Sequence, residues 1–359
     1  MSASNLSIKV GGWQFGSPAV GRDGTIYCTP AGGFNQVLKA YSPYGDDLWH
    51  YEFDSYISRP VISTDGTVYI ATTQSRADEP TVALFAFTEA GGILWSHSWP
   101  LKRSGSSPLC DTLGCVYLVV NHELHKISPS GNVVWTIPVP GHEPTILGEW
   151  EDRIYLLAQN GWQSSICAVT LEGRDLWDLK APFDYAEFQR EVRQRLVEKH
   201  GQVKADQTIV RINYAPPNFE NHAAFTPLGN LISANMDDYL YSISPEGSIN
   251  WRFQPEKAVC IASAGKTAAV YVTWKWGVYA VTENGELLWK QQHHYTTIPV
   301  IGREGQVYVA GMHEASAFDA DGNSLWIEPI RGIPGLNPAV TLEGQFCVTT
   351  DQGYLHLLG

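Results

Sequence analysis

Residues 240–251 read LYSISPEGSINW, and this stretch decides the fold. A short alternating segment begins at Leu240, a polar turn containing Gly247 follows, and a second short segment ends at Trp251. Alternation with a period of two is typical of β-strands, and glycine readily adopts the positive φ that a tight turn needs. The stretch therefore predicts one β-hairpin that ends in an indole.

This hairpin recurs along the chain. In every copy a glycine lies four residues before a tryptophan and seven residues after an apolar or small residue. The copies are Leu38/Gly45/Trp49, Leu84/Gly91/Trp95, Leu124/Gly131/Trp135, Ile166/Gly173/Trp177, Leu240/Gly247/Trp251, Val278/Gly285/Trp289 and Ala315/Gly322/Trp326. A self-similar unit of about 40 residues is the signature of a propeller or a solenoid.

A second repeated piece lies upstream of the hairpins. It starts at a proline and reaches a tyrosine nine residues later, as in PVISTDGTVY from Pro60 to Tyr69, whereas the pair Pro144/Tyr155 is two residues longer. This piece combines an apolar strand, a turn and a strand of β-branched and aromatic residues. Each repeat therefore predicts four antiparallel strands, which is the make-up of a propeller blade.

The number of repeats predicts how the ring closes. Seven repeats end in a tryptophan, and an eighth begins at Pro338 and stops after residues 354–358, without an outer strand. Residues 6–13 form a strand-like segment that ends at Trp13 and can supply it. We therefore predict an all-β, eight-bladed β-propeller of four-stranded antiparallel blades, closed by the N-terminal strand and forming one domain over residues 1–359.

The repeat, of the type L-Y-A-l-x-x-x-G-x-l-l-W, resembles the pyrroloquinoline quinone (PQQ)-type propeller repeat. Quinoprotein dehydrogenases and the lipoprotein propeller of the outer-membrane assembly machinery share this repeat, and the resemblance spans essentially the whole chain. It implies that the repeat tryptophans dock neighbouring blades. They are Trp13, Trp49, Trp95, Trp135, Trp177, Trp251, Trp289 and Trp326.

The cysteines argue against PQQ chemistry. Quinoprotein dehydrogenases carry two adjacent cysteines over the cofactor, and none of the six cysteines here is adjacent to another. We expect them to be reduced core residues. No stretch has the spacing of a zinc motif or a calcium loop. We therefore expect no cofactor and no metal, with calcium as the one ion left open.

The charge and hydropathy of the sequence limit which partners and which cellular location we expect. The net charge of −13 argues against a nucleic-acid or anionic-membrane surface, because both need clustered Lys and Arg. The N-terminus lacks an apolar run of signal-peptide length, and the chain lacks an 18-residue apolar segment. These features predict a cytoplasmic, monomeric protein that binds neither nucleic acid nor membrane.

Residues 178–222 interrupt the regular spacing of the repeats between blades 4 and 5. Asp184 can cap a helix with Glu187 three residues later. Apolar residues then fall on one helical face: Tyr185, Phe188, Val192 and Leu196. We predict an α-helical insertion here that acts as a lid on the top face, because long loops in compact folds are usually functional or disordered.

The residue before each inner strand should point into the central funnel of a propeller. These residues are Ser17, Arg59, Ser107, Glu143, His222, Ile261, Ile298 and Asn337. Most are polar, as a ligand pocket requires, although strand starts are often polar in any case. The loops between second and third strands add further candidates for ligand binding. They are Trp162, Asp237, Trp276 and His313, and the tryptophans could equally pack under the insertion.

Two classes of function fit this funnel. The first is a binding propeller that holds a small molecule, a glycan or a peptide on the top face, beneath the insertion. The second is a cofactor-independent lyase, isomerase, cyclase or hydrolase, in which His222 and Glu143 serve as acid and base and Arg59 binds an anionic group. The fold does not choose between them, since function depends on the site rather than the scaffold.

Overall fold

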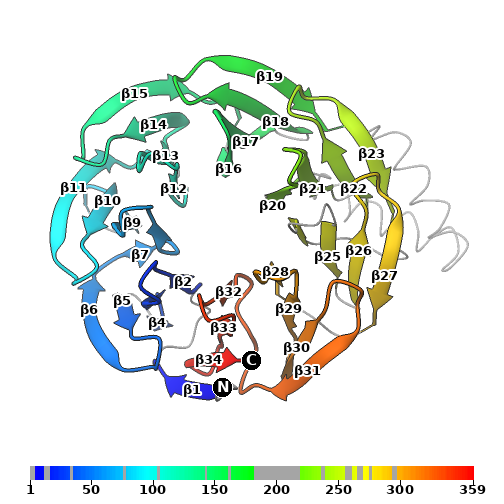
Figure 1. The fold of residues 1–359 in the computed structure, drawn as a ribbon. Coiled ribbons are helices and arrows are strands. Elements are labelled where there is room, and N and C mark those ends of the chain that lie inside the picture. Colours follow the sequence, from blue (N-terminus) through cyan, green and yellow to red (C-terminus); the bar gives the residue numbers. More distant parts are fainter. Residues whose placement is uncertain are drawn as a thin grey trace, which may run out of the picture.

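The computed structural model is a ring of antiparallel β-sheets around a central axis (Figure 1). It describes residues 5–11, 17–32, 35–75, 78–102, 106–141, 144–160, 163–181, 219–235, 239–254, 261–264, 270–274, 277–292 and 297–359. All regular elements among these residues are strands. No helix in this part of the chain has the length and apolar character needed to cross a membrane.

The first half of the chain forms four sheets, each with its strands in chain order from the axis outward. The first sheet is β2 (Ala19–Val20), β3 (Ile26–Cys28), β5 (Asn35–Tyr41) and β6 (Asp47–Phe53), and the second is β8 (Val61–Ile62), β9 (Val68–Gln74), β10 (Thr81–Phe87) and β11 (Ile93–Pro100). The third is β12 (Leu109–Cys110), β13 (Val116–Val120), β14 (Glu123–Ile127) and β15 (Val133–Pro138), and the fourth is β16 (Thr145–Trp150), β17 (Arg153–Asn160), β18 (Gln163–Thr170) and β19 (Asp175–Lys180).

The second half continues the same arrangement. The fifth sheet is β20 (Phe219–Phe225), β21 (Leu231–Asn235), β22 (Tyr239–Ile243) and β23 (Ile249–Phe253), and the sixth is β24 (Ile261–Ala264), β25 (Val270–Trp274), β26 (Gly277–Val281) and β27 (Leu287–Gln291). The seventh is β28 (Val300–Ile301), β29 (Val307–Ala310), β30 (Glu314–Phe318) and β31 (Ser324–Pro329). The last sheet is β32 (Ala339–Val340), β33 (Phe346–Thr349), β34 (Tyr354–Leu358) and β1 (Leu6–Lys9).

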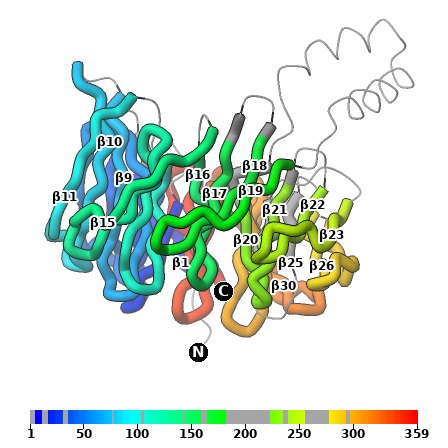
Figure 2. Tube along the Cα trace, turned by 90° about the horizontal axis from the view of Figure 1, so that it is seen from above, coloured from blue at the N-terminus to red at the C-terminus, as the bar shows by residue number. Residues whose placement is uncertain are grey.

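The two ends of the chain close the ring. Strand β1 pairs with β34 in antiparallel register, with Leu6 opposite Leu357 and Ile8 opposite Leu355, which is the closure predicted from the sequence. The inner strands β2, β8, β12, β16, β20, β24, β28 and β32 each contact the next one around the axis, and β32 contacts β2. The sheets therefore stand upright beside one another in a closed ring, as Figure 2 shows from the side.

Several features of the predicted fold are wrong. The blades are not uniformly four-stranded, because β4 (Ala31–Gly32) adds a strand beside β5 and β7 (Tyr56–Ile57) adds one beside β9. The α-helical insertion finds no support, since the described residues contain no helix.

The ends of the predicted insertion belong to the sheets. Residues 178–180 are the last part of β19, and residues 219–222 are the first part of β20. Residues 182–218, which include Asp184 and the predicted apolar helix face, lie outside the described residues.

The hydrophobic core lies in the seams between neighbouring sheets. At the seam between the second and third sheets, Tyr69 and Leu84 pack with Val116 and Leu118, and all four are fully buried. The other seams have the same construction, because successive residues of a strand point to opposite faces and each sheet has a neighbour on both sides. The tyrosines that mark the repeats supply the largest buried side chains of this core.

At each of six seams, a tryptophan of one sheet docks onto the following sheet. Its indole Nε1 donates a hydrogen bond to the backbone carbonyl two residues before the repeat glycine of that sheet. The pairs are Trp49–Glu89 (2.7 Å), Trp95–Pro129 (2.8 Å), Trp135–Leu171 (3.1 Å), Trp177–Pro245 (2.8 Å), Trp251–Glu283 (2.5 Å) and Trp289–Ala320 (2.9 Å). The docking role that the resemblance implied is therefore confirmed for these six, while Trp13 lies outside the described residues.

Two constraints favour glycine in the repeat turn, as Gly131 illustrates. At Gly131 the φ angle is 86°, in the region that disfavours residues with a Cβ. A Cβ at this position would also lie 2.8 Å from Cδ2 of Trp95, so the indole would have to move. Gly344 has a similar φ of 89°, but a Cβ there would meet no atom within 4 Å.

These two glycines allow the indole contact to be measured separately from backbone strain. We expect Gly344→Ala to cost about 1–2 kcal/mol, which is the price of a left-handed backbone alone. Gly131→Ala should cost about 1–3 kcal/mol more, because overpacking against Trp95 adds to the same strain. The measurement is the free energy of unfolding in urea, and equal losses in the two variants would contradict the docking role of Trp95.

The closing sheet contains a buried histidine that binds both chain ends together. His356 is 1% exposed on β34, and its Nδ1 is hydrogen-bonded to the Ser7 hydroxyl of β1 at 2.8 Å. The backbone N–H of Arg331 donates to Nε2 at 3.3 Å. Burial lowers the pKa of His356 below its ordinary value, and the hydrogen bond with the Arg331 backbone offsets this only in part.

The lowered pKa predicts acid-sensitive closure of the ring. Below the ordinary histidine pKa of about 6.5, the unfolded chain binds a proton at this residue more readily than the folded chain. The free energy of unfolding should therefore be highest above this pH and fall as the pH drops towards the lowered pKa. In His356→Gln this pH dependence should shrink, as measured by urea unfolding between pH 7 and pH 5 (about the range in which histidine titrates). Identical slopes in both proteins would show that His356 does not contribute.

Candidate functional site

A cavity of about 200 Å³ lies where inner strands of several sheets meet at the axis. Its wall comes from the residues that precede β8, β12 and β32 and from the first half of β16. The lining residues are Arg59, Ser107, Pro108, Leu109, Thr145, Ile146, Leu147 and Asn337. Three residues predicted for the funnel thus share one cavity, although they are far apart in the sequence.

A serine positions the backbone of Arg59. The N–H of Ser58 donates to the carbonyl of Ala71 at 2.8 Å, and the Ser58 hydroxyl accepts from the N–H of Ala71 at 3.0 Å. The same hydroxyl lies 2.9 Å from the carbonyl oxygen of Arg59, to which it donates. Pro60 follows as a buried residue. Arg59 is therefore held between a clamped serine and a fixed proline.

The same clamp occurs in two other sheets. In the third sheet Ser106 bonds both backbone groups of Val119, and its hydroxyl donates to the carbonyl of Ser107 at 3.0 Å. In the seventh sheet Thr297 bonds both backbone groups of Ala310. We call Ser58, Ser106 and Thr297 the clamp residues. Each is followed by one residue near the axis and then by a proline, which gives the local sequence Ser/Thr-x-Pro.

Arg59 is the one charged residue in the described wall of the cavity. Arg59 is an exposed residue, although the surrounding protein partly desolvates its guanidinium and lowers its pKa. Arginine nevertheless stays protonated at neutral pH. No ion pair joins this guanidinium to any residue that the structure describes. Within the described residues, the cavity therefore presents a positive charge without an ionic partner.

The amide of Asn337 extends the polar wall to the first sheet. Its Nδ2 lies 3.3 Å from the Ser17 hydroxyl and donates to it. The structure therefore brings together four of the predicted site residues: Ser17, Arg59, Ser107 and Asn337. Their roles in binding stay predictions, because proximity alone does not identify a ligand.

The other predicted site residues are not part of this arrangement. His313 is exposed in the turn between β29 and β30 and does not line the cavity. His222 is on β20, but its side chain is outside the described part of the chain. Four further residues lie outside the described residues altogether: Glu143, Trp162, Asp237 and Trp276.

A family model described as outer membrane protein assembly factor BamB matches residues 4–211. The chain belongs to this BamB family. No curated protein matches the sequence, so the family assignment rests on the model and on the repeats.

Solved structures show the same fold at low identity. BamB from Moraxella catarrhalis is 14% identical, with a TM-score of 0.64 over 99% of this chain and 96% of that chain. The Dos1 propeller is 9% identical, with a TM-score of 0.66 over 98% and 94% of the two chains. Streptogramin B lyase is 10% identical, with a TM-score of 0.55 over 99% and 97%. Likenesses at these identities show the fold alone.

The sequence also held signals for residues that the prediction missed. In this BamB-family chain the clamp residues begin the Ser/Thr-x-Pro triplets at residues 58–60, 106–108 and 297–299, directly before inner strands. The same triplet also occurs at residues 98–100 and 136–138, at the ends of outer strands, so its place before an inner strand is part of the signal. Leu147, on the cavity wall, is the extra residue of a β-bulge, since Ile146 pairs with Leu156 and Gly148 with Tyr155. This bulge accounts for one of the two extra residues in the Pro144/Tyr155 spacing.

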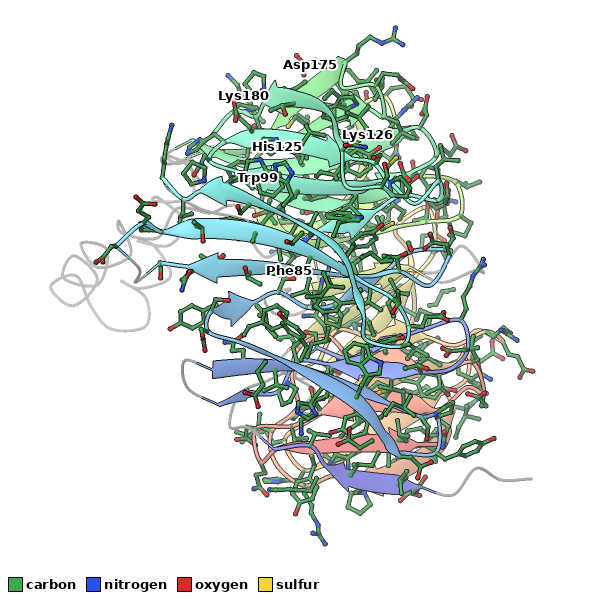
Figure 3. The ribbon with its side chains drawn as sticks, turned by 90° about the vertical axis from the view of Figure 1, so that its left-hand side faces the viewer. Phe85, Trp99, His125, Lys126, Asp175 and Lys180 are labelled. Carbon is green, nitrogen blue, oxygen red and sulfur yellow. The ribbon has the colours of Figure 1, made fainter. Side chains whose placement is uncertain are left out.

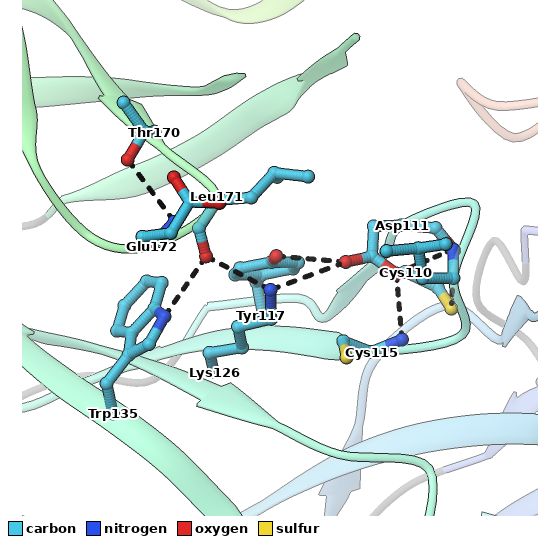
Figure 4. Close-up of polar contacts among 10 residues, drawn as sticks. Cys110, Asp111, Cys115, Tyr117, Lys126, Trp135, Thr170, Leu171 and Glu172 are labelled. Atoms are coloured by element: carbon cyan, nitrogen blue, oxygen red, sulfur yellow. Dashed lines mark hydrogen bonds and ion pairs between the residues drawn. The ribbon is translucent and has the colours of Figure 1, made fainter. Parts of the chain in front are cut away.

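A second cluster of charged residues lies in the seam between the third and fourth sheets (Figure 4). The buried carboxylate of Asp111 accepts hydrogen bonds from the N–H of Cys115 at 2.8 Å and the hydroxyl of Tyr117 at 2.9 Å. Lys126 lies 3.9 Å from Asp111 and donates to the carbonyl of Leu171 at 3.0 Å. Burial, and then Asp111, raise the pKa of Tyr117. These groups satisfy one another, so the cluster joins two sheets and leaves nothing for a ligand.

A third cluster combines two imidazoles and an indole between the second and third sheets, and Figure 3 labels two of its members, Trp99 and His125. The ring of Trp99 is 4.3 Å from that of His97 and 5.2 Å from that of His125. His125 also pairs with the Thr136 hydroxyl at 2.9 Å, and burial lowers its pKa. Trp99 therefore has a packing role. Within the described residues, no three His, Cys, Asp or Glu side chains are grouped to hold a metal.

The clamp predicts a specific loss of stability in Ser58→Ala. The N–H of Ala71 would lose its acceptor in a buried position, and an unsatisfied buried donor costs about 1–3 kcal/mol. Ser75→Ala is the matched control, because Ser75 is exposed after the end of the same strand, β9. Urea unfolding measures both variants, and losses of equal size would contradict the clamp.

Proposed function

We propose that this BamB-family propeller is a binding protein that holds a small polar ligand in its axial cavity. One observation carries the proposal: Arg59, Ser107 and Asn337, from three different sheets, line one cavity together with Thr145. Convergent polar groups in a concave, partly apolar wall are the usual mark of a ligand site. The packing of the ring does not need these groups, since the core is built in the seams.

The size of the cavity limits the ligand. A volume of about 200 Å³ is below the range of about 300–1,000 Å³ that is typical of pockets for drug-sized molecules. A compact metabolite therefore fits better than an oligosaccharide or a folded partner. A terminal sugar unit or the end of a peptide would reach the same wall, so the test includes a sugar and a peptide as probes.

The comparisons are compatible with binding but name no ligand for this chain. BamB is described as an assembly factor, and the Dos1 structure is described as a propeller. Propellers of this kind suggest a role in holding a protein or a small molecule. Streptogramin B lyase shows that an enzyme can have a similar fold.

The alternative, a cofactor-independent enzyme, receives less support from the geometry. It would use Glu143 and His222 as base and acid, and the side chains of both lie outside the described residues. The part of the cavity wall that the structure describes offers a guanidinium, hydroxyl groups and an amide, but no acid–base pair. Binding is therefore the function that we infer.

A cavity-filling variant tests the proposal without assuming which ligand binds. The probes are butyrate, butyramide, N-acetylglucosamine and glycylglycine, which sample small acids, neutral amides, sugars and peptides. At least one should raise the melting temperature of the wild-type protein, because a ligand that binds only the folded state stabilises it. In Ser107→Trp, where an indole occupies the cavity, this rise should disappear.

The control for this experiment is Thr112→Trp. Thr112 is exposed in the turn between β12 and β13, outside the cavity wall, so this variant should keep the ligand-induced rise. If none of the probes shifts the melting temperature, or if the rise is unchanged in Ser107→Trp, the axial cavity is not the binding site.

A further inference from the structure

We propose that the ligand of the axial cavity is a small organic acid, whose carboxylate pairs with Arg59 and whose short aliphatic body lies against Leu109 and Ile146. This inference rests on the proposed function, since it names the chemical class of the ligand bound at the same site. It follows from the charge, the donors and the apolar part of the cavity wall, which are independent observations.

The charge of the wall selects an anion. Acidic residues outnumber basic ones by 37 to 24 in the chain, yet no described residue pairs with the guanidinium of Arg59. The described wall contains no carboxylate that could repel an anion. The surrounding protein desolvates Arg59, and an ionic contact is stronger where water is partly excluded. An anion would therefore satisfy a charge that the described residues leave without an ionic partner.

The polar neighbours of Arg59 are suited to the same group. Ser107 and Thr145 carry hydroxyls, and Asn337 carries an amide whose Nδ2 already points to Ser17. Hydroxyl and amide groups donate hydrogen bonds to a carboxylate, and a guanidinium binds it through two parallel N–H groups. The clamp at Ser58 fixes the backbone of Arg59, so less freedom is lost when the side chain binds.

The apolar part of the wall distinguishes an organic acid from a bare inorganic anion. Pro108, Leu109, Ile146 and Leu147 supply half of the lining residues. Such a wall stabilises a ligand in proportion to the apolar surface that it removes from water. Inorganic phosphate has no such surface. The cavity is also too small for a long chain, because its volume is about 200 Å³. A body of a few carbon atoms satisfies both limits.

Butyrate and butyramide test the charge requirement directly, because they have nearly the same shape and differ in charge. Dissociation constants are measured by NMR titration of the ¹⁵N-labelled full chain at pH 7.5 (roughly three units above an ordinary carboxylate pKa). We expect wild-type protein to bind butyrate at least about tenfold more tightly than butyramide, as expected for a charge-assisted hydrogen bond. Inorganic phosphate should bind more weakly than butyrate.

Two substitutions of Arg59 separate charge from geometry. Arg59→Gln should abolish the preference for butyrate over butyramide. Arg59→Lys should keep a reduced preference, because an ammonium supplies charge without the planar fork. The control is Arg303→Gln, which removes the same charge from an exposed turn between β28 and β29 and should leave the preference intact.

The outcomes distinguish this inference from the proposed function. If Ser107→Trp abolishes binding of both probes but Arg59→Gln leaves their ratio unchanged, the cavity is a binding site and the organic-acid inference is wrong. Equal binding of butyrate and butyramide by the wild-type protein, or tighter binding of phosphate than of butyrate, would also overturn it. If neither butyrate nor butyramide binds, the inference fails, and the proposed function fails with it only if N-acetylglucosamine and glycylglycine also leave the melting temperature unchanged. If both probes bind Ser107→Trp as they bind the wild type, the proposed function and the inference fail together.

Discussion

The contact between a tryptophan indole and the glycine turn of the next sheet is the interaction on which the rest of the structure depends. No sheet of this chain can bury both of its faces alone, because successive residues of each strand point to opposite sides. The indole covers the turn of the following sheet, and its N–H binds a carbonyl there, as in Trp95 with Pro129 at 2.8 Å. The turn can approach so closely only because Gly131 has no Cβ and adopts a positive φ. One residue pair, repeated around the axis, thus sets the spacing of neighbouring sheets and makes a closed ring possible.

Closure of the ring makes the axial cavity a rigid site. Strand β1 pairs with β34, and the buried His356 binds Ser7 across this pair. Each inner strand then lies between two others, so the residue that precedes it has a fixed place relative to the axis. The clamps at Ser58 and Ser106 fix the backbone of Arg59 and Ser107 in turn. A scaffold of this kind holds the backbone that carries the guanidinium in position, whereas a flexible loop would let the whole residue turn to bulk water or to a nearby carboxylate.

The sequence predicts those features that repeat, and it fails for those that occur once. The hairpins ending at Trp49 and its equivalents, the closure by residues 6–9 and the approach of Arg59, Ser107 and Asn337 all follow from a periodic spacing. Strands β4 and β7 were missed because they lie in connections whose sequences have no counterpart in other repeats. The place of β7 depends on a long-range contact, since the side-chain oxygen of Gln36 accepts a hydrogen bond of 2.8 Å from the N–H of Ile57. The apolar wall was missed for a related reason: Leu147 reaches the cavity through a bulge, and a bulge changes which face a residue occupies.

Comparison of equivalent positions shows that the fold does not require a cation at the axis. Ile298 follows a clamp residue and precedes a proline just as Arg59 does, and its N–H bonds to the carbonyl of Leu336 at 2.8 Å. An apolar side chain at this position is therefore compatible with the same backbone, the same clamp and the same ring. Placing a guanidinium there instead costs desolvation energy, which no described ion pair offsets. Because the fold accepts isoleucine at the equivalent position of the seventh sheet, the packing of the propeller does not require the arginine of the second sheet, and the proposed acid would account for it.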